Sequence, residues 1–286
     1  MSVRRIVGGA IYALSAAIGV LAFVYPFLFD AQAGGSIGAA HSQDAVLATT
    51  ALVGLSLVAL LVELQGQAIS AKTVALLGVL VAITSTLRFI EVAVPMPGGF
   101  SPIFAPIILA GYVFGSRFGF LMGAFTLLVS GLITGGVGPW LPYQMFAAGW
   151  IGLTAGWLKI SNLRSLISTP GYWRLEIALL SIFAFIWGLL YGAIINLYFW
   201  PFAVGPVEQS WTSGIGLGET LARYAAFYAV TSLGWDVARA VGNASLILLL
   251  GAPTVRVLAR FRRRFYFETD PKGFLKPLGS RGSADA

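Results

Sequence analysis

The stretch that decides the fold is residues 118–158, FGFLMGAFTLLVSGLITGGVGPWLPYQMFAAGWIGLTAGWL. It carries no charged side chain and is far longer than the about 20 apolar residues that one membrane-spanning helix needs. Its middle, residues 135–139 (GGVGP), ends helices, because glycine is flexible and proline lacks the amide donor. The stretch therefore predicts a hairpin of two membrane-spanning helices.

The composition of the whole chain agrees with a membrane location. Of its 286 residues, 58% are hydrophobic and 10% are charged, and the mean hydropathy is +0.85. A soluble domain carries roughly 25% charged residues, so we expect an integral membrane protein. The chain has no cysteine and one histidine, His41. This excludes disulfides, thiolate catalysis and metal centres built from cysteine or from several histidines.

Further apolar runs extend the prediction to eight membrane-spanning helices. Runs without any charge lie at residues 6–29, 45–62, 102–116 and 177–207. Two more spans become long enough only when charged residues are admitted inside them. They are residues 73–95, with Arg88 and Glu91, and residues 231–255, with Asp236 and Arg239. The expected fold class is an all-α polytopic membrane protein.

Basic residues predict the orientation, because they concentrate on the cytoplasmic side. If the N-terminus is placed in the cytoplasm, all but three of the 18 Lys and Arg residues lie in the tail or at helix ends on the cytoplasmic side. The connections on the other side carry the acids Asp30, Asp44, Glu208 and Glu219. We expect a multi-pass protein of the plasma or inner membrane with both termini cytoplasmic. The basic tail, residues 256–286, then serves orientation and phospholipid contact rather than nucleic-acid binding.

Polar residues inside the predicted spans form two stripes. Ionisable groups in hydrocarbon cost several kcal/mol, so they usually face a partner or a cavity. The first stripe is Thr84, Arg88 and Glu91 on residues 73–95, with the spacing i, i+4, i+7. The second is Asp236, Arg239 and Asn243 on the last helix, with the spacing i, i+3, i+7. Each spacing places its three residues on one face of the helix.

Two interpretations of these stripes stay open. They could be structural pairs between helices, for example Arg88 with Asp236 and Glu91 with Arg239. They could also line a pocket, open to the outside, for a small polar heterocycle. The candidate substrate-binding residues are Arg88, Glu91, Gln144, Tyr191, Asn196, Asp236, Arg239 and Asn243. Aromatic residues of the long connection before the last helix are either interfacial belt residues or a lid: Trp200, Trp211, Tyr224 and Tyr228.

Small residues mark one face of residues 73–95 and the turn before them. Ala71, Ala75, Gly78 and Ala82 follow a small-xxx-small pattern, which lets another helix approach closely. The strip predicts either packing within this chain or a docking surface for a separate membrane subunit.

Motifs of catalysis are missing. The sequence contains no G-x-x-x-x-G-K-[ST], no G-x-S-x-G and no H-E-x-x-H, so it offers no P-loop, nucleophile elbow or zinc-protease site. No cofactor and no metal site are expected, and an intramembrane enzyme is the weakest hypothesis.

Three segments resemble a known family. Residues 100–106 (FSPIFAP), 111–125 (GYVFGSRFGFLMGAF) and 135–157 (GGVGPWLPYQMFAAGWIGLTAGW) resemble the substrate-specific S component of energy-coupling factor (ECF) vitamin transporters. The resemblance covers roughly residues 72–255. It implies a six-helix core, residues 67–255, that captures a vitamin from outside without an ATPase of its own. A transmembrane coupling (T) subunit and two ATP-binding subunits would supply the energy, and the domain would topple within the membrane.

The resemblance also assigns the small-residue strip to the contact with the coupling subunit. One departure is the additional transmembrane hairpin, residues 1–66, whose role stays open. The ligand also stays open: cobalamin, a pyrimidine precursor, a flavin and a queuosine-like base all suit the pocket chemistry. The alternative from another class is a structural membrane scaffold subunit of a cell-envelope complex, which would bind no small molecule.

Overall fold

The computed structural model describes residues 3–28, 71–94, 98, 100–138, 140–158 and 172–265. Within these ranges the secondary structure is helical throughout, which confirms the predicted all-α class. The helices are α1 (Val3–Leu28), α3 (Ala71–Ala93), α4 (Phe104–Phe114), α5 (Ser116–Thr134), α6 (Leu141–Ala155), α8 (Tyr172–Phe199), α9 (Leu217–Thr231) and α10 (Leu233–Phe265). The predicted span at residues 45–62 and the tail beyond residue 265 lie outside the described residues.

Four of these helices are long and apolar enough to cross a bilayer. The qualifying segments are Thr73–Ala93, Ser116–Thr134, Trp173–Phe202 and Leu233–Arg262. Their outer faces carry large apolar side chains, such as Leu249 at 75% exposure and Ile83 at 53%. Outward apolar faces on helices are what a bilayer requires, because the helix satisfies its own backbone hydrogen bonds. The chain is thus a polytopic membrane protein.

The predicted hairpin is present as α5 and α6, although only α5 is long and apolar enough to cross a bilayer. Gly135 ends α5 with a φ of 70°, a left-handed conformation that glycine adopts at little cost. Gly119 on α5 faces Gly152 on α6, and a Cβ at either position would overlap the other residue's backbone. Small residues therefore allow these two helices to pack more closely than larger side chains would permit.

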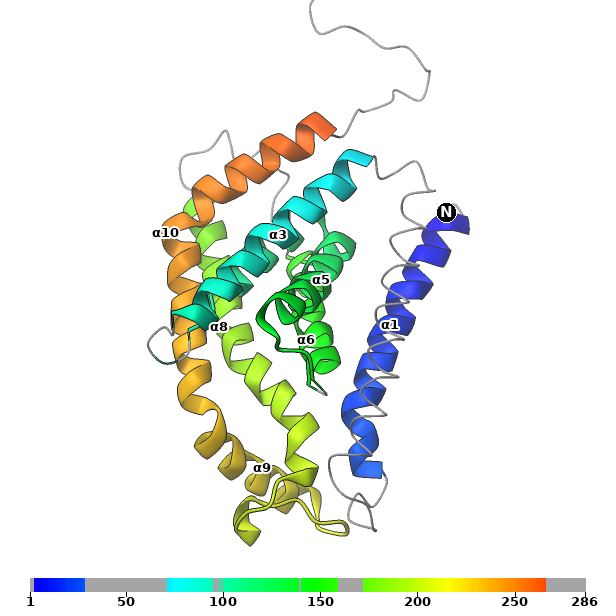
Figure 1. Cartoon of the computed structure of the whole chain (residues 1–286), viewed down its shortest axis with the longest axis vertical. Helices are drawn as coiled ribbons and strands as arrows, with labels where there is room; N and C mark the ends of the chain where they lie inside the picture. The colour runs from blue at the N-terminus through cyan, green and yellow to red at the C-terminus, as the bar shows by residue number, and fades with distance from the viewer. Residues whose placement is uncertain are drawn as a thin grey trace, which may run out of the picture.

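The core forms around α4, a short helix enclosed by longer ones. Ile107, Ile108 and Val113 are fully buried, and α4 contacts α5, α6, α8 and α10. Helix α3 lies on α5, and α10 packs along α8 (Figure 1). Because α4 is apolar on all sides, burial in the middle of the bundle is the expected place for it.

Helix α10 begins close to the predicted residue 231 but continues past the predicted end at residue 255. Val255, Leu258 and Ala259 keep one face buried at 2%, 7% and 5% exposure, a spacing that extends the helix by an amphipathic segment. Pro253 lies inside the helix, and α10 changes direction towards its C-terminal end (Figure 1), as prolines commonly cause.

The connection between α8 and α10 contains a helix that the sequence did not predict. Helix α9 and two 3-10 turns, Trp200–Phe202 and Val207–Gln209, occupy it. They lie at the end of the molecule opposite the C-terminal end of α10 (Figure 1). We call the packed rings of this connection the aromatic cap: Trp200, Trp211, Tyr224 and Phe227, with Phe27 of α1 packed against them.

Candidate functional site

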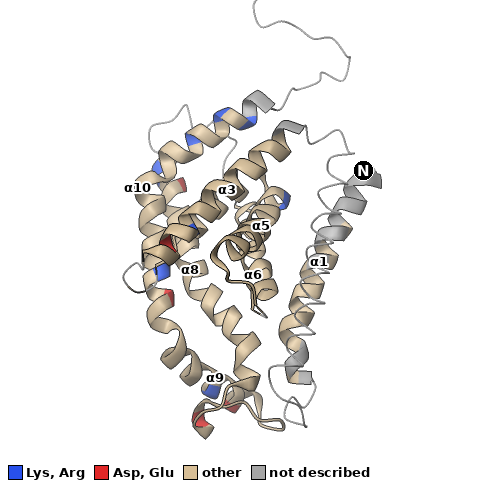
Figure 2. Cartoon of the chain, viewed as in Figure 1, with Lys and Arg blue, Asp and Glu red and all other residues tan. Residues whose placement is uncertain are grey.

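Charged residues of both signs lie about halfway along the bundle, on α3 and on α10 (Figure 2). Arg88 and Glu91 of α3 form an ion pair at 3.9 Å, and Arg239 pairs with Asp236 within α10. The pairs expected between helices, Arg88 with Asp236 and Glu91 with Arg239, are not the ones formed. Residues three apart on one helix are already neighbours, so each stripe neutralises itself.

Hydrogen bonds join the two helices through the segment that leads into α4. The Ser101 hydroxyl donates to Glu91 Oε2 at 2.6 Å. Asn243 Nδ2 donates to the Ser101 carbonyl at 2.8 Å, and the amide of Ala105 donates to Asn243 Oδ1 at 2.9 Å. The first amides of a helix lack partners within the helix. Asn243 therefore caps α4 from a neighbouring helix and holds this segment between α3 and α10.

Arg239 also lies against two aromatic rings. Its guanidinium carbon is 5.1 Å from the ring centroid of Tyr191 and 5.7 Å from that of Phe104. The two rings are 4.7 Å apart. These distances fit cation–π contacts. Sequence reasoning selected Tyr191 and missed Phe104, although Phe104 lies within the FSPIFAP segment.

Asp236 is the most buried of the four charged groups, with its side chain 1% exposed. Gly192 of α8 makes room for it, since a Cβ there would overlap the carboxylate. Its Oδ2 atom is buried and accepts no hydrogen bond from the described residues. Burial and the nearby Asp236 raise the pKa of Tyr228 on α9 to about 12. Its hydroxyl donates to the Leu189 carbonyl at 3.3 Å.

Two of the predicted site residues lie apart from these contacts. Asn196 Nδ2 donates to Thr231 Oγ1 at 3.0 Å and to Ser232 Oγ at 2.9 Å. Asn196 therefore ties α8 to the joint between α9 and α10. Gln144 of α6 is half-buried, and none of the contacts that join the other predicted residues reaches it. No group of three or more metal-ligating side chains occurs in the part of the chain that the structure describes.

Comparison with known families gives one match. The family described as "ECF transporter, substrate-specific component" matches residues 72–252, which is more than half of the chain. The chain belongs to this family. No curated protein and no solved structure matched it. An S component is part of a transporter and not an enzyme, and the structural-scaffold alternative is not favoured.

The family match begins at α3, so α1 precedes the matched region of this S component. Within the match, the small-residue strip of α3 is on the surface. Ala75, Gly78 and Ala82 are exposed, and a Cβ at Gly78 would meet no atom within 4 Å. The side chain of Ala71 lies outside the described ones. Ala75, Gly78 and Ala82 therefore do not pack against another helix among the described residues.

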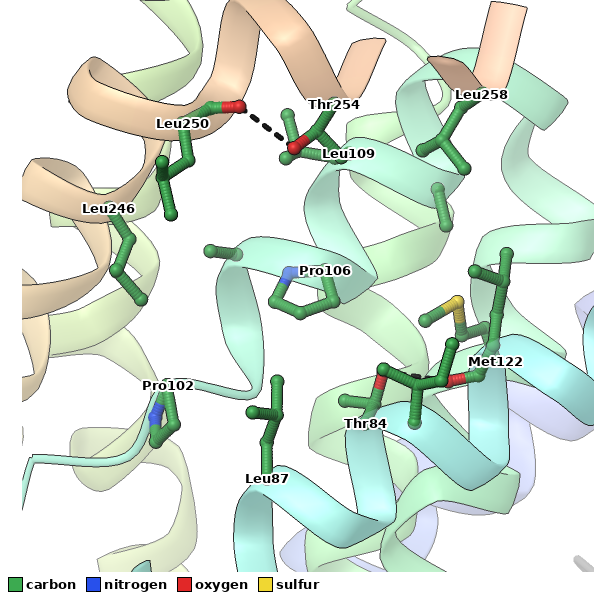
Figure 3. Close-up of a pocket in the computed structure, with 14 residues that line it drawn as sticks. Thr84, Leu87, Pro102, Pro106, Leu109, Met122, Leu246, Leu250, Thr254 and Leu258 are labelled. Carbon is green, nitrogen blue, oxygen red and sulfur yellow. Dashed lines mark hydrogen bonds between the residues drawn. The ribbon is translucent and has the colours of Figure 1, made fainter.

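A groove that the sequence did not predict lies between α3 and α10, above α4 (Figure 3). It has a volume of about 320 Å³ and an almost entirely apolar lining. Its two hydroxyl groups are used within their own helices: Thr84 donates to the Leu80 carbonyl and Thr254 to the Leu250 carbonyl, each at 2.8 Å. The groove therefore offers no polar group for recognising a polar ligand.

Proposed function

We propose that this S component binds a vitamin or related heterocyclic micronutrient at what we call the polar cluster. The cluster comprises Arg88, Glu91, Ser101, Phe104, Tyr191, Asp236, Arg239 and Asn243. The observation that carries the proposal is Arg239, a charged group held against two rings about halfway along an apolar bundle. Charges inside a membrane domain are costly and commonly mark a ligand path.

The cluster has the parts that recognition of a small heterocycle needs. The rings of Tyr191 and Phe104 offer stacking surfaces, and arginine and carboxylate groups offer donors and acceptors. Side chains of Arg88, Glu91 and Arg239 keep 23%, 16% and 16% of their surface exposed, so a ligand can reach them. The two pairs cancel in charge, which favours a ligand without a large net charge.

Buried members of the cluster take supporting roles in this proposal. Asn243 is fully buried and bonded to backbone groups, so we assign it to positioning rather than to ligand contact. Asp236 holds Arg239 against the rings. Asn196 acts at the joint of α8 with α9 and α10, and Gln144 is the least supported of the predicted contacts.

We also propose that the chain works in an ECF-type ABC importer, with a coupling subunit and two ATP-binding subunits. The exposed strip of Ala75, Gly78 and Ala82, with Ala71 one turn before it, supports docking of the coupling subunit. In this proposal both termini are cytoplasmic and the ligand arrives from outside.

The test is native mass spectrometry of the purified full chain, which reports any retained small molecule. We expect the wild type to carry one bound molecule, Arg239→Gln to lose it, and Arg223→Gln to keep it. Arg223 is a matched control because it forms an ion pair with Glu219 on α9, outside the polar cluster. Retention of the same molecule by Arg239→Gln would place the ligand elsewhere.

A further inference from the structure

We propose that α1 acts as a brace: it holds α9 beside Asp236 and thereby sets how tightly the polar cluster retains its ligand. The inference rests on the proposed function, because it concerns the ligand of that same cluster. It gives a role to a helix that precedes the region matched by the family. A continuous series of contacts, from Phe27 of α1 to Arg239 of α10, carries the inference.

One face of α1 is anchored on the bundle. Gly19, Phe23 and Phe27 follow one another at steps of four residues, which places them on the same side of the helix. A Cβ at Gly19 would overlap the ring of Phe146 on α6. Phe23 is 4% exposed and packs edge-on against Tyr143 of α6, with ring centroids 5.0 Å apart. Helix α1 is therefore fixed against α6 along the face that leads to Phe27.

The end of this face reaches the aromatic cap. Phe27 lies near the C-terminal end of α1, at the same end of the molecule as α9 (Figure 1). Its ring centroid is 6.0 Å from that of Trp200 and 5.6 Å from that of Trp211. The ring of Trp200 in turn lies 5.0 Å from Tyr224 and 6.5 Å from Phe227, both on α9. Aromatic rings at these distances attract one another, so Trp200 joins α1 to α9.

Helix α9 is held on α8 by two tyrosine hydroxyl groups. Tyr224 and Tyr228 are four residues apart and so share one face of α9. Their hydroxyls donate to the carbonyls of Ala193 and Leu189 on α8, which are also four residues apart. The two helices are therefore tied together at two successive turns. The ring of Tyr224 is also the one that Trp200 contacts, so the brace acts on the first of these ties.

The second tie lies beside the buried carboxylate of the polar cluster. Leu189 and Gly192 are three residues apart on α8. Tyr228 bonds to the first of them, and the carboxylate of Asp236 lies against the second. The effect of Asp236 on the pKa of Tyr228 agrees with this closeness. Asp236 pairs with Arg239, so displacing α9 removes a wall from Asp236 and loosens the guanidinium that contacts the ligand.

Helix α9 has little buried surface of its own. Among its 15 residues, Phe227 is the one that is buried. Segments with few buried apolar contacts open at a low cost in free energy. Contacts made from outside the helix therefore decide how long α9 stays in place, and Phe27 supplies such a contact.

The experiment measures amide hydrogen exchange of the purified full chain in phosphatidylcholine nanodiscs. Phe27→Ala removes two ring pairs, so the amides of α9 should exchange about 5- to 150-fold faster. Leu21→Ala, at an exposed position of the same helix, is the matched control and should exchange as the wild type does. Amides of α5 should not change in either variant, which separates release of α9 from a general loss of stability.

The second measurement is the release of the bound mass that native mass spectrometry finds on the wild type. Phe27→Ala should release it at least about fivefold faster than Leu21→Ala. Phe27→Tyr keeps the ring and should release it as slowly as the wild type. Trp211→Leu removes one ring pair from the other side and tests the same contact if Phe27→Ala does not fold. The double variant should lose less than the sum of the two single effects, because both remove that pair.

Two results would overturn the proposal. The first is equal exchange of α9 in Phe27→Ala and Leu21→Ala. The second is faster exchange of α9 with unchanged release of the bound mass, which would mean that α9 moves without affecting the polar cluster. The proposed function fails by other results, namely a wild type without any bound mass or retention of that mass by Arg239→Gln. Exchange of α9 would still decide in those cases whether α1 holds it.

Discussion

The polar cluster and the apolar groove lie along the same faces of α3 and α10, yet they are built in opposite ways. On α3 the face runs from Glu91 through Leu87 to Leu80, and on α10 it runs from Arg239 to Leu246 and beyond. In the polar cluster every side chain contacts a partner, and only the Oδ2 atom of Asp236 accepts no hydrogen bond from the described residues, whereas the groove is left open. Polar groups in a membrane domain must be satisfied from within, while apolar surface can be completed by lipid.

The largest effect is expected where the polar cluster loses a buried charge. Asp236→Ala leaves Arg239 without its carboxylate, and breaking a buried pair in this way typically costs about 3–5 kcal/mol. The matched control is Glu219→Ala, which breaks the Arg223 pair on α9, where Glu219 is 53% exposed and the expected cost is about 0–1 kcal/mol. Thermal unfolding in detergent measures both. Equal losses would mean that burial does not distinguish the two pairs.

A smaller but clear loss is expected at the cap of α4. Asn243→Ala leaves the Ala105 amide and the Ser101 carbonyl without partners, and stranding buried backbone groups costs about 1–3 kcal/mol each. Asn196→Ala removes bonds only to two hydroxyl groups, which can turn to other acceptors, so about 1 kcal/mol is expected. Chemical unfolding of both variants would contradict this order if Asn196→Ala were the less stable.

The aromatic cap should respond to α1, which lies outside the matched family region. Phe27 packs on Trp200 and Trp211 with ring centroids 6.0 and 5.6 Å away. Each such ring pair contributes about 0.5–1.5 kcal/mol, so Phe27→Ala should lower the free energy of unfolding by about 1–3 kcal/mol in total. Leu21→Ala, on an exposed face of α1, is the control and should be nearly neutral. Similar unfolding temperatures for the two variants would show that α1 does not support the cap.

Sequence reasoning located the elements of the site better than its contacts. Hydrophobic length and the GGVGP break predicted α3, α4, the α5–α6 hairpin and the start of α10, because these signals are local. Helical spacing placed Arg88 with Glu91 and Asp236 with Arg239 on shared faces. It could not decide whether each charge would pair within its helix or across to the other, because that depends on how α3 and α10 cross.

The parts that sequence reasoning missed depend on tertiary packing. Phe104 carries no polar atom, so nothing in its residue type marks it as a partner of Arg239. Asn243 resembled a ligand contact because its backbone partners, at and just before the start of α4, are more than a hundred residues away in the sequence. The extension of α10 past residue 255 was obscured by its arginines, although Val255 and Leu258 kept the apolar period.

The smallest change in the stability of the isolated chain is expected for substitutions in the small-residue strip. Because such variants should stay folded, any loss of the coupling subunit can be attributed to docking. Ala75 and Ala82 are exposed on α3 and Gly78 borders open space. Ala75→Trp and Ala82→Trp should therefore change the unfolding free energy by no more than about 0.5 kcal/mol. Because the strip permits close helix approach, the same variants should lose co-purification with the coupling subunit while still retaining the small molecule. Leu249→Trp, at an exposed position of α10, should keep the partner. If Ala75→Trp and Ala82→Trp captured the coupling subunit as well as Leu249→Trp, the docking surface would lie on a different face of the bundle.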